Sequence, residues 1–486
     1  MPLDSLAPAR FVERPMCVRW IVAGLFVVSM FGTEMPSEVR RLAGLAASLP
    51  PEFQADALLQ IVETRGGLNA AQKMDLLEQA ATLAQQAKYA YPKMTATAIN
   101  ADSRQAFEAN ALALKLDRLS LETRSIRDLL ALDPIAARRL FQQTQKPAPP
   151  PGTCADALVP LLDDYYDVAI HVISRGFSAK EIDREDHVAL TLQIVAGVKM
   201  PYEIAPAARM IAGARLTPLQ FEAALNAFTS RLEATTPDDR AFSETGLAVQ
   251  QEIASLAAHA TSLGVSRGTL ARAYRKYLTS NYSGPRCADS ANARIAGTAV
   301  NSPVEWFNQS DLRGDLAVIA MKELKAKDAE GTLQVNAFWS TPDSEKILVS
   351  AQALRLSAGG VPFSMQDRAS TEWNQKLQDF LAQLNNWKQS GVETELDFFN
   401  QKATVYESLI DVYPSGDGRQ RMIGAFVEFL KSSTVLDHSP VNWFWHAQNM
   451  YRRLRQGGDA DAKKLMAAYK ASGSLMLEVY AQFNVQ

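Results

Sequence analysis

The stretch LPPEFQADALLQIVET (residues 49–64) decides the fold class, because its apolar residues recur every three or four positions. One face of the resulting helix carries Phe53, Ala57, Leu58, Ile61 and Val62. Such spacing buries one stripe of a helix, and the segments 74–84, 422–430 and 443–454 repeat it. Sustained strand-type alternation is absent from the sequence, and 331–339 is the only stretch where a strand is arguable. We therefore predict an all-α fold.

An oxygen-bearing side chain followed by proline marks each predicted helix start. Such pairs occur at Asp133-Pro134, Thr217-Pro218, Thr236-Pro237, Ser302-Pro303, Thr341-Pro342 and Ser439-Pro440. The oxygen can accept a hydrogen bond from a free amide of the first turn, where the missing N–H of proline costs nothing. Ser302 with Glu305 also has the spacing of a capping box. The intervals between starts suit pairs of helices joined by short turns, so we predict an α-solenoid or irregular array of antiparallel helix pairs.

One hexapeptide occurs twice in related form. SPVEWF at 302–307 recurs as SPVNWF at 439–444. The flanking residues do not match well, which favours one capped-helix device used twice over duplication of a larger unit. In both copies we expect the Trp and Phe to pack at the start of a helix. The chain shows no strict period of about 34 residues, so no standard repeat consensus applies.

The N-terminus has the pattern of an export signal. Arg10, Arg14 and Arg19 precede a nearly unbroken apolar run at 20–31. A basic flank followed by about a dozen apolar residues is typical of a secretory signal, and the run is shorter than the roughly 20 residues that span a bilayer. We assign 1–32 to a signal peptide, with an uncleaved N-terminal anchor as the alternative. The mature chain is then expected in the periplasm or outside the cell.

Proline and glycine suggest how the mature chain divides. Consecutive prolines in KPAPPPG (146–152) cannot continue a helix and favour a stiff, extended connector. A weaker break lies at SAGGVP (357–362). The predicted division is an N-terminal helical region at 33–146, a linker at 147–153, a central region at 154–357 and a C-terminal region at 358–486.

Charge and composition exclude several functions. The full chain of 486 residues has a formal net charge of -3 and contains no basic block that would indicate nucleic-acid binding. Hydrophobic residues make up 47%, which is ample for a core. No apolar run after residue 32 approaches spanning length, so we predict no membrane span in the mature chain. No cofactor is predicted.

Two cysteines of the mature chain lie in similar settings. Cys154 in PGTCAD and Cys287 in GPRCAD each follow a Pro/Gly turn and precede a helical stretch. In an exported chain, two thiols in matching loops favour a disulfide, and we predict one between them. Two unrelated buried thiols are the alternative.

The run DDYYD (163–167) is the sharpest candidate for chemistry. Asp163 and Asp167 are one turn apart on a helix and, with Asp164, could hold Mg²⁺ through carboxylate oxygens. The pattern resembles the first metal motif of helical isoprenoid synthases, which bind a diphosphate through magnesium. The second motif of that family, of the NDxxSxxxE kind, is absent from this sequence. The alternative is an acidic solvated face whose two tyrosines pack inward.

A second candidate is the aromatic stretch near the C-terminus. Trp443, Trp445 and His446 could line a sugar or peptide groove, although aromatic residues at helical spacing are usually core. The sequence contains no SxxK, CxxC, HExxH or P-loop motif. No catalytic residue is therefore assigned.

Two stretches give the chain its family likeness. LPPEFQADALL (49–59) and LDPIAARRLF (132–141), with the paired CAD turns, resemble exported, tetratricopeptide-like helical proteins of environmental bacteria. The resemblance implies an α-helical architecture and no particular activity. Our leading hypothesis is a non-catalytic scaffold of the bacterial cell envelope that binds protein or peptide.

Two alternative functions remain open at this stage. One is an exported carbohydrate-active enzyme built as an α/α toroid, and the other is a purely structural envelope component. A toroid would close on itself, with acids and tryptophans around a central cleft, whereas a solenoid would leave its ends apart.

Overall fold

The computed structural model describes residues 35–96, 102–283, 287, 293–321, 338–339, 341–356, 362–368, 370–410, 412 and 416–484. This part of the chain forms 23 helices and two three-residue strands, which confirms the all-α prediction. None of these helices is both long and apolar enough to cross a membrane. The export signal expected at 1–32 lies outside the described residues, as does most of the stretch 331–339.

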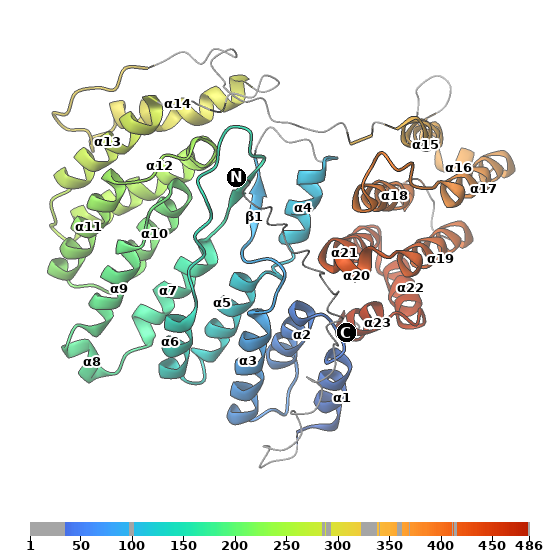
Figure 1. Ribbon diagram of the computed structural model, residues 1–486, viewed down its shortest axis with the longest axis horizontal. Helices are drawn as coiled ribbons and strands as arrows, with labels where there is room; N and C mark the ends of the chain where they lie inside the picture. Colours follow the sequence, from blue (N-terminus) through green and yellow to red (C-terminus); the bar gives the residue numbers. More distant parts are fainter. Residues whose placement is uncertain are drawn as a thin grey trace, which may run out of the picture.

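The first fourteen helices form an array, in which nine of them pack in two rows. They are α1 (Ser37–Ala46), α2 (Pro51–Thr64), α3 (Ala70–Ala84), α4 (Arg104–Leu112), α5 (Arg118–Leu129), α6 (Pro134–Gln143), α7 (Asp163–Arg175), α8 (Ala179–Asp183), α9 (Asp186–Ala196), α10 (Pro201–Gly213), α11 (Pro218–Glu233), α12 (Asp239–Ser262), α13 (Gly268–Ser283) and α14 (Ala293–Gln309). In one row α3, α5, α7, α10, α12 and α14 pack in succession, and in the other α9, α11 and α13 do so. Figure 1 shows these helices side by side along the array.

The remaining helices form a second group, at the right of Figure 1. They are α15 (Pro342–Ala353), α16 (Met365–Arg368), α17 (Thr371–Asn386), α18 (Glu395–Ile410), α19 (Asp417–Ser432), α20 (Val435–His438), α21 (Pro440–Gln456), α22 (Asp459–Lys470) and α23 (Leu475–Asn484). Within it α21 packs on α18 and α22, and α19 packs on α18 and α22. The group has its own hydrophobic core, to which Phe53 and several other residues of the N-terminal helices also contribute.

The first and last described helices meet. Helix α1 packs on α23, and α4 packs on α21. Phe53 and Phe444 make an edge-to-face ring contact with centroids 5.1 Å apart, and Arg41 Nη1 donates to Oε1 of Gln482 at 2.7 Å. The first and last helices of the described chain are therefore in contact, whereas an open solenoid would leave them apart.

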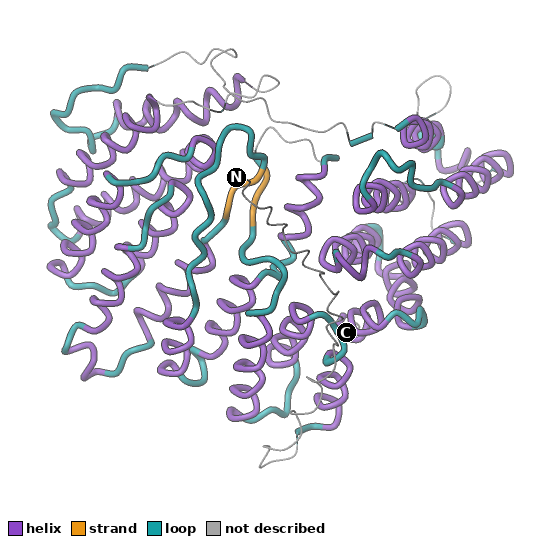
Figure 2. The backbone as a smooth tube through the Cα atoms, in the orientation of Figure 1, coloured by secondary structure: helices purple, strands orange, loops and turns teal. Residues whose placement is uncertain are grey.

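A two-stranded antiparallel ribbon lies within the first group of helices, where it contacts α4 and α12 (Figure 2). Strand β1 (Lys93–Thr95) pairs with β2 (Leu158–Pro160), so that Met94 faces Val159. The sequence analysis did not predict these strands, because three residues are too few to show alternation. The ribbon ties the segment after α3 to the segment that precedes α7.

Three of the predicted helix caps are confirmed. Oδ1 of Asp133 accepts hydrogen bonds from the first turn of α6, with the Ala136 amide 2.9 Å away. Thr217 and Gln220 form a reciprocal capping box at the start of α11. Thr341 caps α15 by accepting from the amide of Ser344 at 3.1 Å. In all three, proline occupies the first helical position.

The other three predicted caps need correction. Ser302-Pro303 lies inside α14, so its capping box is wrong. Val304 and Phe307 are fully buried there, and their packing outweighs the roughly 3 kcal/mol that an internal proline costs. Helix α12 begins at Asp239 and is capped by Asp238, two residues after Thr236. Helix α21 does begin at Pro440, but the Ser439 side chain makes no capping hydrogen bond. The two SPVxWF copies therefore occupy different positions, one inside a helix and one at a helix start.

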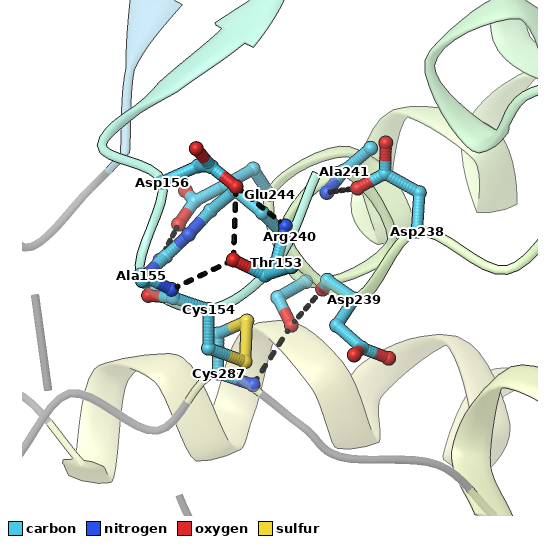
Figure 3. The surroundings of a disulfide bond; sticks show 11 residues. Thr153, Cys154, Ala155, Asp156, Asp238, Asp239, Arg240, Ala241, Glu244 and Cys287 are labelled. Carbon is cyan, nitrogen blue, oxygen red and sulfur yellow. Dashed lines mark hydrogen bonds and ion pairs between the residues drawn. A yellow bond between two sulfur atoms is a disulfide. The ribbon is translucent and has the colours of Figure 1, made fainter. Parts of the chain in front are cut away.

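The predicted disulfide is present. Cys154 and Cys287 are bonded across a sequence separation of 133 residues, and each is 2% exposed. Arg240 donates to the carbonyl of Cys154, and the Cys287 amide donates to Oγ of Ser243 at 3.2 Å (Figure 3). The bond to Cys154 and the hydrogen bond to Ser243 hold Cys287 beside the start of α12.

The proline-rich segment is anchored at its end. The Gly152 amide donates to Oδ2 of Asp238 at 2.8 Å, while Oδ1 of Asp238 caps α12. A Cβ on Gly152 would lie 3.0 Å from Oδ1 of Asp238, so this close approach favours glycine. Residues 145–157 belong to no helix or strand. One hydrophobic core nonetheless includes residues on both sides of the predicted linker, such as Phe141 and Tyr166.

Asp117 gives a testable pH dependence. It caps α5 through Oδ1, and burial raises its pKa to about 6. Because the unfolded value is about 3.9, ionisation destabilises the folded chain as pH rises from about 4 to about 6. Above pH 6 the ionised Asp117 should therefore lower the free energy of unfolding. Below pH 4 the group is protonated in both states and has no such effect.

We expect Asp117→Asn to remove this dependence. The free energy of unfolding of the variant minus that of the wild type should rise by on the order of 3 kcal/mol between about pH 4 and pH 7. Urea unfolding across that range measures the difference. A constant difference at all pH values would contradict the raised pKa.

Candidate functional site

Trp443, the first residue of the predicted ligand surface, belongs to the core. It lies in the first turns of α21 with 0% of its surface exposed. Its Nε1 donates to the carbonyl of Leu430 at 3.0 Å, which satisfies the only polar atom of the side chain. The indole therefore fastens α21 to the end of α19 and has no face toward solvent. Its position matches neither a ligand groove nor the central cleft expected of a toroid.

His446 lies in a buried polar cluster between α18 and α21. Its Nδ1 donates to Oε1 of Glu407 at 2.8 Å, and its Nε2 is 3.1 Å from Oδ1 of Asn400. Asn449 donates to the second oxygen of Glu407 at 2.6 Å. His446 is 0% exposed and Glu407 2% exposed. A histidine–carboxylate pair can move protons in an enzyme, but this pair has no contact with solvent through which a substrate could reach it.

Trp445 is the one partly exposed member of the predicted surface. Its ring makes edge-to-face contacts with Phe107 of α4, with centroids 5.7 Å apart, and with His446 at 4.6 Å. It thus covers the buried cluster where α4 meets α21. The structure does not bring Trp443, Trp445 and His446 together as an open surface, because successive residues of a helix point in different directions.

The predicted metal face on α7 is occupied by an arginine. Nη1 of Arg209 lies 3.5 Å from Oδ1 of Asp163 and 3.3 Å from Oδ1 of Asp167, while its Nε contacts Glu252 at 3.0 Å. Asp164 instead pairs with Lys115 at 3.0 Å. The guanidinium thus lies where a Mg²⁺ ion would have to bind the two carboxylates. In the described part of the chain, no group of three or more His, Cys, Asp or Glu residues could hold a metal ion.

The two tyrosines of DDYYD pack inward, as the alternative interpretation predicts. Tyr166 is 0% exposed and donates to Oε1 of Glu203 at 2.9 Å. Tyr165 is 8% exposed and packs on Phe141 with ring centroids 5.1 Å apart. The motif is therefore an acidic helix face above two core aromatics. Its likeness to the isoprenoid-synthase motif does not extend to the surroundings of the carboxylates.

An open polar hollow between α11 and α13 is the best candidate for a binding site. Its volume is about 330 Å³. Seven residues line it: Thr229, Ser230, Glu233, Ala234, Thr269, Arg272 and Lys276. The first three come from the end of α11, Ala234 directly follows that helix, and the last three come from α13. We call this hollow the α11–α13 groove.

Charge and hydroxyl groups are unevenly distributed in the α11–α13 groove. Lys276 pairs with Glu233 at 3.0 Å, with 57% and 40% of the two side chains exposed. Within the described residues the exposed Arg272 side chain has no hydrogen-bond or ion-pair partner. The hydroxyls of Thr229 and Ser230 both donate to the carbonyl of Asn226, which leaves their oxygens able to accept. The groove therefore offers one unpaired cation and one weakly held cation.

A smaller hollow of about 150 Å³ lies beside the disulfide region. It is bounded by the proline-rich segment, strand β2 and the start of α12, including Asp238 and Arg240. Both of these side chains hold the loops that Figure 3 shows. We therefore attribute this hollow to the packing of the Pro-rich segment against β2 and α12, and assign it no ligand.

No motif in the sequence predicts the α11–α13 groove. Its residues come from helices about forty positions apart, and none belongs to a catalytic or metal motif. One signal was present: α13 contains Arg272, Arg275 and Lys276 and no Asp or Glu. A helix whose charges all have one sign is a candidate for binding the opposite charge.

Comparison with known proteins gives no guide to the ligand. No protein family, curated protein or solved structure matches this chain.

Proposed function

We propose that this chain is an exported, non-catalytic scaffold of the bacterial cell envelope that binds a protein or peptide partner. The observation that carries the proposal is the α11–α13 groove, an open hollow between neighbouring helices of one row of the array. Stacked helices present extended surfaces of this kind to partners. We also propose that the chain is related to the exported, tetratricopeptide-like proteins that 49–59 and 132–141 resemble.

Two features support export. The basic residues and apolar run at 1–32 have the pattern of a secretory signal. The Cys154–Cys287 disulfide suits an oxidising compartment such as the periplasm or the extracellular medium. Neither feature identifies the partner.

Non-catalytic binding accounts for the described polar clusters better than the toroid enzyme does. Glycoside hydrolysis requires two carboxylates that flank a substrate. Asp163 and Asp167 instead share Arg209, and Glu407 is sealed with His446. The α11–α13 groove contains a single carboxylate, Glu233.

In-cell crosslinking tests the proposed function. The full chain would carry a C-terminal tag, and crosslinked complexes from the envelope fraction would be purified and identified by mass spectrometry. We expect one protein to be enriched reproducibly over an untagged control. The Arg139→Glu/Lys180→Glu variant, with exposed changes on α6 and α8 away from the groove, should capture the same protein. If the wild type enriches no protein, the scaffold proposal fails, and a glycan panel would then test the enzyme alternative.

A further inference from the structure

We propose that the α11–α13 groove binds the carboxylates of an acidic peptide segment, an inference that rests on the proposed function. The outward face of α13 is cationic, since Arg272 and Lys276 are exposed one helical turn apart. The opposite face is core, where Leu270, Tyr274 and Tyr277 are buried. Packing of the apolar face therefore fixes the rotation of α13, so that both cations point into the groove and away from the hydrophobic core.

The two cations differ in how available they are. The guanidinium of Arg272 has a planar fork that fits both oxygens of a carboxylate, and no described residue uses it. Lys276 is held by Glu233 across an exposed ion pair. Such pairs contribute only about 0–1 kcal/mol, so an incoming carboxylate can replace Glu233. The third cation of α13, Arg275, donates to the carbonyl of Ala317 at 2.8 Å and is already engaged.

Hydroxyl groups complete the site. Thr229 and Ser230 from α11 and Thr269 from α13 line the groove beside the cations. The hydroxyls of Thr229 and Ser230 already donate within α11, so they can accept from peptide N–H groups. The hydroxyl of Thr269 can also donate to a carboxylate oxygen. A volume of about 330 Å³ is at the small end of the range for ligand pockets. The groove thus has room for one or two side chains of a peptide, with the rest of the peptide lying across the array.

Charge argues against nucleic acid as the ligand. Binding a phosphate backbone depends on many lysines and arginines along a continuous patch. The groove has two such residues, and the whole chain has a net charge of -3. A short acidic segment requires only as many cations as the groove supplies.

Fluorescence polarisation with the full chain tests the inference. The probes are fluorescein-labelled hexaglutamate, hexalysine and an uncharged Gly-Ser peptide. We expect only hexaglutamate to bind, and salt to weaken its binding. Arg272→Glu/Lys276→Glu should reduce the affinity by about tenfold or more. Glu233→Gln removes the competing carboxylate and should increase the affinity by about threefold. This gain cannot come from misfolding.

The control is Arg139→Glu/Lys180→Glu, which changes net charge by the same amount as the groove variant and should bind hexaglutamate like the wild type. An equal loss in both double variants, or no hexaglutamate binding by the wild type, would overturn the inference. Binding of inorganic phosphate without hexaglutamate binding would overturn it too. If crosslinking still captures a partner in those cases, the scaffold proposal stands and only the acidic-ligand inference fails.

Discussion

Trp443→Ala should lower the free energy of unfolding by about 3–5 kcal/mol, the usual cost of truncating a large core aromatic. The side chain is 0% exposed, and its loss leaves a cavity and removes one of the two donors to the Leu430 carbonyl, which keeps its bond from the Ser433 amide. A loss of this size is a large part of the stability of most domains. Thermal and urea unfolding of the purified variant would measure it.

Trp445→Ala is the matched control, two positions along the same helix. Its ring is only partly buried and makes edge contacts, so its truncation should cost clearly less than that of Trp443. An unfolding midpoint of Trp443→Ala equal to that of the wild type would mean that the indole is not core. The interpretation of this residue as a ligand surface would then return.

Breaking the Cys154–Cys287 bond should have an effect of similar size. The bond closes a loop with a sequence separation of 133 residues, for which the chain-entropy model gives about 5 kcal/mol. The Cys154→Ser/Cys287→Ser variant should therefore unfold at a much lower urea concentration. Without the bond the unfolded chain has a higher conformational entropy, which lowers the free energy of unfolding. The folded structure loses little else, because Asp238 can still cap α12.

Reductant supplies the control for the disulfide prediction. Reduced wild type should unfold at the same midpoint as the double serine variant, and the variant itself should not respond to reductant. Mass spectrometry of non-reduced peptides would show the cross-link directly. Free thiols on both cysteines, or equal midpoints with and without reductant, would contradict the prediction.

Local chemistry predicted the all-α class and three of the six proposed helix caps. Thr217, Thr341 and Asp133 cap helices because a side-chain oxygen and a following proline act within one turn, which sequence alone can show. Ser302-Pro303 carries the same signal and fails, because burial of Val304 and Phe307 keeps α14 helical through the proline. The return of α23 to α1 was not predictable either, since it depends on packing between distant segments.

The candidate site was less predictable than the fold. Trp443 and His446 attracted attention as residue types, yet their neighbours on α18 and α19 decide that they are buried. Asp163 and Asp167 do share a face, as helical spacing requires, but Arg209 from α10 determines what they bind. The α11–α13 groove arises only when two helices of one row lie side by side. Its ordinary residue types leave no motif in the sequence.

Site-specific photo-crosslinking tests most directly whether the partner occupies the α11–α13 groove. A benzoylphenylalanine would replace Ser230, which is exposed at the groove, and separately Arg139, which is exposed on α6. Irradiation in cells followed by mass spectrometry would identify the crosslinked segment. We predict one partner crosslinked through Ser230 and not through Arg139, with acidic residues next to the attachment point. A partner that crosslinks through Arg139 and not through Ser230 would contradict the assignment of this groove as the binding site.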